Sequence, residues 1–64
     1  MELTEKEKRV VNFLREKQMF CFKHTILNGV DIRRTTLSRV LRELRKKEIV
    51  FYKLRRWGFN YETL

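Results

Sequence analysis

Residues 36–50 read TLSRVLRELRKKEIV, and the spacing of apolar residues in this stretch decides which fold the chain can adopt. Four apolar residues stand at positions i, i+3, i+4 and i+7, which places them on one side of an α-helix. They are Leu37, Val40, Leu41 and Leu44. Threonine, serine and basic residues take the other side. The pattern predicts a helix over residues 33–47 with a buried stripe, a cationic exposed face and Asp31 as its N-cap.

The residues before this helix predict two further helices and a strand. Thr4 and Glu7 have the spacing of a capping box, which predicts a first helix over residues 5–17. The aromatic-rich residues 19–22 are too few for a helix, so we expect a short strand. Residues 23–28 predict a helix of about two turns.

A β-hairpin is predicted over residues 49–63, after the cationic helix. Its two runs of β-branched and aromatic residues flank residues 55–58, RRWG, which suggests a loop of two to four residues with two arginines and the tryptophan at the tip. Gly29 and Gly58 are both interpreted as turn residues. The elements predict an α+β fold in a single domain. A chain of 64 residues buries only ~60% of its unfolded surface, which disfavours a deep catalytic cleft.

The positive charge is concentrated in one part of the chain. The net charge is +8. Residues 33–56 alone carry ten basic groups against two acidic ones, whereas residues 1–32 are nearly neutral. Seven of those ten are arginines, whose guanidinium groups suit phosphates and guanine edges. The asymmetry favours a polyanionic partner, and the alternative is a basic surface maintained for solubility.

The sequence also indicates where the protein resides and which chemistries it lacks. No apolar run is long enough to span a membrane, and the charged N-terminal residues do not resemble a secretory signal, so we expect a cytoplasmic protein. Cys21 and His24 are too few to form a zinc site. Nucleophile–base sets, paired carboxylates and phosphate-binding loops are not evident, so we expect no enzyme activity, no metal and no cofactor.

The aromatic residues have two interpretations. Core packing is expected for the phenylalanines, because so small a domain needs most of its aromatics inside; the alternative is stacking on single-stranded bases. These are Phe13, Phe20, Phe22, Phe51 and Phe59. Trp57 could lie beside a sugar, pack on the hairpin or anchor a protein partner. Apolar surface at Phe13 or Met19 could support a weak homodimer, although a monomer is equally compatible with the sequence.

The order helix, short strand, short helix, basic helix and hairpin resembles the winged helix-turn-helix domain, across nearly the whole chain. Residues 36–50 are similar to recognition helices of MarR-like and ArsR-like transcription regulators, in the Thr-apolar-Ser-Arg start and the Leu-x-x-Lys-x-apolar-Val exit. Glu48 departs from the family, which usually has glycine where this helix ends, and the connection before Thr35 is longer than the family's turn.

The resemblance implies sequence-specific binding of double-stranded DNA and regulation of transcription. The helix over residues 33–47 would enter the major groove, where Arg39 and Arg42 read bases or phosphates, and the hairpin would approach the minor groove. The expected contact residues are Arg33, Arg34, Thr35, Thr36, Ser38, Arg39, Arg42, Lys46, Lys53, Arg55, Arg56 and Trp57. Two alternatives are an RNA-binding or ribosome-associated domain and a protein-interaction module with the same fold.

Overall fold

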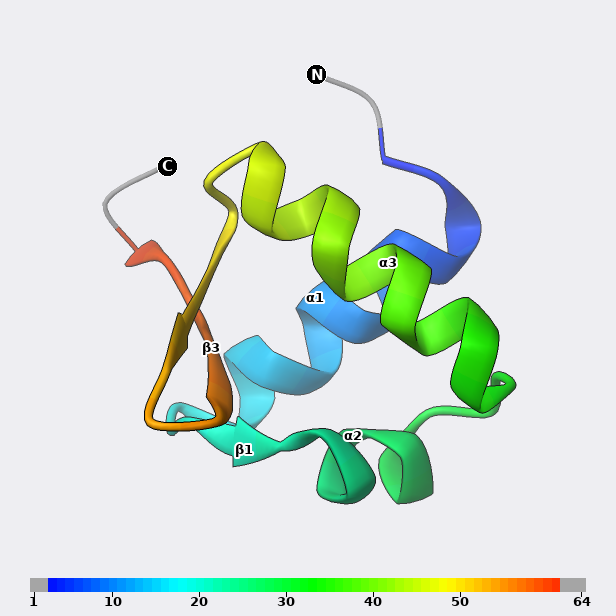
Figure 1. Cartoon of the computed structure of the whole chain (residues 1–64), viewed down its shortest axis with the longest axis horizontal. Helices are drawn as coiled ribbons and strands as arrows, with labels where there is room; N and C mark the ends of the chain where they lie inside the picture. Colours follow the sequence, from blue (N-terminus) through cyan, green and yellow to red (C-terminus); the bar gives the residue numbers. More distant parts are fainter. Residues whose placement is uncertain (1–2, 62–64) are drawn as a thin grey trace.

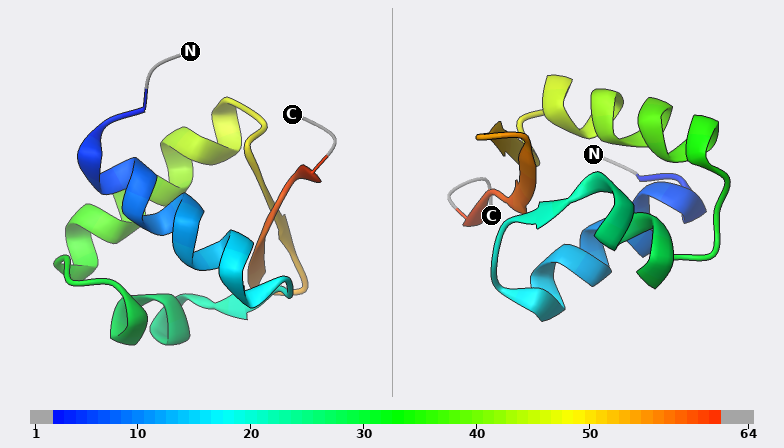
Figure 2. Two further views of the ribbon diagram at one scale, coloured as in Figure 1. Left: turned by 180° about the vertical axis from the view of Figure 1, so that it is seen from behind. Right: turned by 60° about the horizontal axis from the view of Figure 1, so that its bottom comes forward.

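The computed structural model describes residues 3–61, which form an α+β fold of three helices and one small sheet (Figure 1). In chain order the elements are α1 (Glu5–Lys17), β1 (Cys21–Phe22), α2 (Lys23–Gly29), α3 (Arg34–Lys46), β2 (Val50–Lys53) and β3 (Arg56–Phe59). The sheet is antiparallel with the order β1-β3-β2, so β3 is its central strand. The two long helices α1 and α3 cross one another, and the β2–β3 hairpin stands at the C-terminal end of α3 (Figure 2).

The core lies between α1, α3 and the inner face of the sheet. The predicted apolar stripe of α3 is buried, and α1 contributes a matching set of buried side chains. The buried apolar residues are Val10, Val11, Leu14, Cys21, Ile26, Val30, Leu37, Val40, Leu41, Leu44, Val50 and Phe59. Of the phenylalanines expected inside, Phe59 is buried and Phe13 packs against the core, but Phe20, Phe22 and Phe51 are exposed. The expectation of core packing is wrong for these three.

Helix α1 has the predicted bounds and the predicted N-terminal cap. The Glu7 amide donates to Thr4 Oγ1 at 3.2 Å, and the Thr4 amide donates to Glu7 Oε1 at 2.8 Å. This reciprocal pair satisfies donors that a helix start otherwise leaves without partners. The helix ends at Lys17. Its C-cap residue, Gln18, adopts a left-handed conformation and donates its amide to the Leu14 carbonyl at 3.1 Å.

Helix α3 begins at Arg34, and its N-cap is Arg33 rather than Asp31. The prediction placed the start too early because side-chain capping was taken as the signal, whereas Arg33 makes no side-chain cap bond. Packing accounts for the later start: Val30 is buried and Ile32 packs against the core, so an extended segment must carry both side chains inward before the helix can begin.

The C-terminus of α3 is closed by a Schellman motif. The Ile49 amide donates to the Leu44 carbonyl and the Glu48 amide to the Arg45 carbonyl, both at 3.0 Å. Glu48 stands at the position where such motifs favour glycine, with φ of 60°. The chain thus ends this helix in the ordinary way despite lacking the glycine.

The strands are shorter than predicted. Residues 19 and 20 precede β1 instead of belonging to it, and β3 ends at Phe59, while residues 62–63 of the predicted hairpin lie outside the described part. The turn consists of Leu54 and Arg55 alone, both with positive φ. Arg56 and Trp57 therefore lie in β3, and not at the hairpin tip as predicted.

Both glycines are required by close packing rather than by a turn. A Cβ atom on Gly29 would lie 1.9 Å from the Phe13 ring, and one on Gly58 would lie 2.7 Å from the Phe20 ring. Neither glycine has positive φ. The turn interpretation is therefore wrong at both positions, since each glycine instead gives an aromatic ring room to approach the backbone.

Candidate nucleic-acid interface

The exposed face of α3 carries most of the predicted contact residues. Because the helix buries one apolar stripe, its cationic residues are turned toward solvent. The exposed members are Arg34, Thr35, Arg39, Arg42 and Lys46, with Arg33 exposed just before the helix. Thr36 and Ser38 are half-buried at the edges of this face. The face has room for a partner along the whole helix.

A small hollow of about 250 Å³ lies between α3 and the hairpin. Three elements line it, with residues Lys23 from α2, Ser38, Leu41, Arg42 and Arg45 from α3, and Trp57 from β3. The Lys23 ammonium donates a hydrogen bond to the Ser38 hydroxyl, which joins α2 to α3 at one edge. The hollow is rich in cationic donors and has an aromatic wall.

Trp57 is held in this wall by its neighbours. It is half-buried, and its ring lies 4.5 Å from that of Tyr52, its cross-strand partner. The Arg45 guanidinium stands 5.3 Å from the centre of the Tyr52 ring, an arrangement in which the ring attracts the cation. Of the roles left open for Trp57, the structure shows packing on the hairpin, and the stack links the hairpin to the end of α3.

Two of the predicted hairpin contacts point away from this hollow. Lys53 and Arg56 are a cross-strand pair, one position along from Tyr52 and Trp57, and successive residues of a strand point to opposite faces. Arg56 lies over the ring of Phe22 at 4.7 Å. The structure therefore separates Lys53 and Arg56 from the cations of α3. Arg55 lies between the two faces, at the exposed tip of the turn.

The arginines are not neutralised within the described part of the chain. In residues 3–61 the ion pairs are Lys47 with Glu7 at 2.9 Å and Lys46 with Glu43 at 3.9 Å, and neither involves an arginine. Guanidinium groups left without a carboxylate at the surface keep their full field for an external anion. Arginines without carboxylate partners among residues 3–61 are the main electrostatic feature of the α3 face.

Sequence reasoning missed two cations of the hollow, Lys23 and Arg45. Arg45 is seven positions after Ser38 and three after Arg42, so helical spacing alone could have identified it. Lys23 could not be predicted from helical spacing, because its place beside Ser38 depends on how α2 packs against α3.

Comparisons with protein-family models, with curated proteins and with solved structures found no match to this chain. Two further observations concern residues 3–61. They contain no group of three or more histidine, cysteine or acidic residues that could hold a metal ion. None of their helices is both long and apolar enough to cross a bilayer.

Proposed function

We propose that this chain is a small winged-helix protein that binds double-stranded DNA and regulates transcription by occupying specific sites. The protein acts in the cytoplasm by binding alone, without a catalysed reaction or a cofactor. In this proposal α3 lies in the major groove, and the β2–β3 hairpin is the wing that meets the adjacent backbone.

The observation that carries the proposal is the row of unpaired, exposed arginines along α3. Arg39 stands in the middle of the exposed face, and Arg42 is shared between that face and the hollow beside Trp57. An exposed helix with this charge matches the width and potential of the major groove. The order of helices and strands is also the order that the winged-helix resemblance implies.

The hairpin supports the proposal through its contact with α3 and through its exposed tip. The Arg45–Tyr52–Trp57 stack fixes the hairpin beside the helix. Arg55 then projects from the tip, where a guanidinium can bind phosphates or enter a minor groove. Lys53 and Arg56 contribute less in this proposal, because they lie on the other face of the hairpin.

The decisive experiment is a salt titration of duplex binding by the full chain. Neutralising five to eight phosphates gives a slope of log K against log salt of about −4 to −7. We expect Arg39→Ala to weaken binding and relax sequence preference by about 1–3 kcal/mol, and Arg55→Ala to weaken binding to all duplexes alike. Lys8→Ala removes an equal charge from the exposed surface of α1 and serves as the control.

The alternatives give different results in the same titration. A ribosome-associated or RNA-binding domain prefers single-stranded or duplex RNA to duplex DNA of the same sequence. A protein-interaction module shows no duplex binding that depends on salt. Equal effects of Arg39→Ala and Lys8→Ala would refute the assignment of α3 as the reading element.

A further inference from the structure

The outer face of the hairpin carries an exposed aromatic cluster that the duplex proposal does not use. Phe20 is 37% exposed and Phe51 is 46% exposed, although such rings belong to the best core-forming residues. Phe51 belongs to β2 and Phe20 immediately precedes β1. Phe51 pairs with Gly58, and the Phe20 ring lies against Gly58, so both rings are on the face of the sheet opposite Trp57. Neither ring is buried in the core, so core packing does not explain why these aromatic residues stand there.

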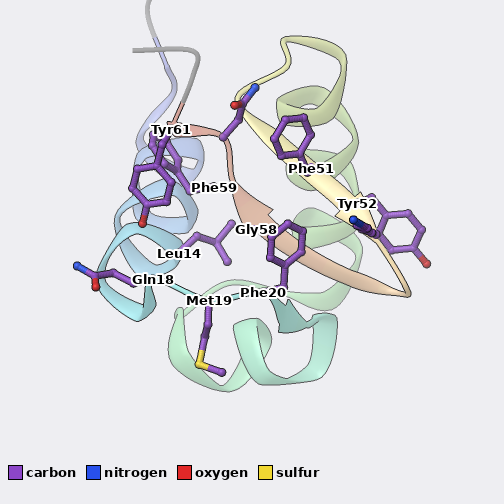
Figure 3. Close-up of a pocket in the computed structure, with 11 residues that line it drawn as sticks. Leu14, Gln18, Met19, Phe20, Phe51, Tyr52, Gly58, Phe59 and Tyr61 are labelled. Carbon is purple, nitrogen blue, oxygen red and sulfur yellow. The ribbon is translucent and has the colours of Figure 1, made fainter.

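These rings line a hollow of about 570 Å³ over the central strand (Figure 3). Gly58 forms part of its base, and Phe20 and Phe51 stand together on one side of Gly58, with Tyr61 on the other. Leu14 and Phe59 add apolar surface from the core. The volume is within the range of ligand sites, about 300–1,000 Å³.

Phe20 also borders a second hollow, of about 390 Å³, on the side toward the hairpin tip. Lys53 and Arg56 line this second hollow, and Lys53 lines both. Arg56 is oriented by the Phe22 ring beneath it, at 4.7 Å, and Phe22 in turn stacks on His24 at 5.5 Å. Two neighbouring hollows thus share the exposed cation Lys53, and the second also contains Arg56.

We propose that this outer face of the hairpin binds a single-stranded nucleic acid, with unpaired bases stacked against Phe20 and Phe51 and the phosphates on Lys53 and Arg56. Aromatic platforms with adjoining cations are the general means of holding unpaired bases, and every base offers a ring for stacking. The site differs from the α3 face in its residues and in its ligand, so it stands whether or not α3 binds duplex DNA.

Charge favours this occupant over a second copy of the chain. A symmetric dimer through the aromatic cluster would bring two sets of Lys53, Arg55 and Arg56 together, and like charges so placed repel. A polyanionic strand is instead attracted by them. The same cations also disfavour a wholly apolar protein segment, which would leave them without partners.

The test measures binding of oligothymidylate and of a duplex by the full chain and three variants. We expect Phe51→Ala to weaken oligothymidylate binding about ten-fold while duplex binding is unchanged, because stacking on one ring is lost. Phe51→Trp restores the affinity. Arg39→Ala is the matched control: it should weaken duplex binding and leave oligothymidylate binding unchanged. Phe51 is exposed, so its truncation leaves the buried core intact.

A fluorescence measurement tests directly whether a base stacks on the ring at position 51. Trp57 is the only tryptophan of the chain, so Trp57→Phe combined with Phe51→Trp moves the probe to the outer face. Quenching of this probe by oligothymidylate supports stacking there. The proposal is overturned if oligothymidylate binds without quenching, or if Phe51→Ala leaves its affinity unchanged. It is also overturned if Phe51→Ala alters only a concentration-dependent dimer seen in sedimentation.

Discussion

Glu7 is the residue on which the start of α1 and the end of α3 both depend. One carboxylate oxygen accepts from the Thr4 amide at 2.8 Å, and the other accepts from the Lys47 ammonium at 2.9 Å. Burial acts to raise the pKa of Glu7, but the hydrogen bonds from Thr4 and Lys47 and the charge of Lys47 outweigh it and hold this pKa below its ordinary value of 4.5. The folded state therefore favours the ionised form.

This arrangement predicts a loss of stability in acid. A carboxylate whose pKa is lower in the folded state stabilises the fold above its unfolded pKa, near 4.5, and this contribution is lost as the pH falls through the folded value. Glu7→Gln retains a capping oxygen but loses the charge, and we expect it to cost about 1–2 kcal/mol at pH 7. Urea unfolding at pH 7 and pH 3 should show wild type and variant converging in acid. A gap of the same size at both pH values contradicts the prediction.

Gly29 gives a second prediction at the residue scale, because two known effects oppose each other there. Alanine in place of a helical glycine normally stabilises by about 0.5–1 kcal/mol. Here the added Cβ would lie 1.9 Å from the Phe13 ring, and overpacking of this kind costs about 1–3 kcal/mol. We therefore expect Gly29→Ala to destabilise the protein. Combining it with Phe13→Leu should recover part of the loss in a double-mutant cycle of thermal unfolding, whereas additive effects would show that the ring is not responsible.

At the scale of the element, the hairpin turn uses residues that disfavour its conformation. Leu54 and Arg55 have φ of 52° and 64°, the sign that a two-residue type I′ turn requires, yet Asn-Gly is the usual sequence there. Left-handed backbone costs an ordinary side chain about 1–2 kcal/mol. Leu54 is also 82% exposed, so it gains little from packing. The conformation of Leu54 and Arg55 therefore lowers the stability of the fold, while both side chains stand at the tip of the hairpin.

We expect Leu54→Asn to stabilise the fold by about 0.5–1 kcal/mol, because asparagine tolerates this conformation. The melting temperature should rise by several degrees, given about 4–8 °C per kcal/mol for a chain of this size. Leu54→Ala removes the apolar side chain without relieving the backbone and is the control. If both variants melt at the same temperature, the backbone conformation is not the cause.

Elements with a local cause were predictable, and elements with a tertiary cause were not. The capping box of Thr4 and Glu7 places α1 correctly, and the stripe that includes Leu37 and Leu44 identifies α3 to within a residue at each end. The N-cap of α3 was wrong because it follows from the burial of Val30 and the packing of Ile32. Gly58 was misread because the Phe20 ring, and no turn, demands a glycine there.

At the scale of the whole molecule, the candidate interface was predictable on α3 but not on the hairpin. Helical spacing turns Arg39 outward whatever the helix packs against. The position of Trp57 depends on a strand register that a shift of one residue would reverse, and the sequence left this register open. The outer aromatic face could not be predicted either, since Phe20 and Phe51 are distant in sequence and line one hollow only because each lies beside Gly58 in the folded chain.

The concentration of charge on so small a body predicts that salt stabilises the free protein. The fold spans 27 × 25 × 19 Å and the chain carries +8. At 0.01 M salt the screening length, about 30 Å, exceeds the molecule, and at 0.15 M it falls to about 8 Å. Repulsion among the unpaired arginines is therefore felt across the whole fold at low salt only. We expect the melting temperature to rise by several degrees between these conditions, measured by circular dichroism without nucleic acid.

The effect should depend on where charge is removed. Arg34→Gln with Arg39→Gln takes two charges from the exposed surface of α3, where no carboxylate of residues 3–61 pairs with them. The double variant should therefore raise stability at 0.01 M salt and flatten the salt response. Lys6→Gln with Lys8→Gln removes the same charge from α1, in the part of the chain where basic and acidic residues nearly balance, so its salt response should stay near that of wild type. Equal flattening by both pairs would mean that total charge, and not its place on α3, sets the repulsion.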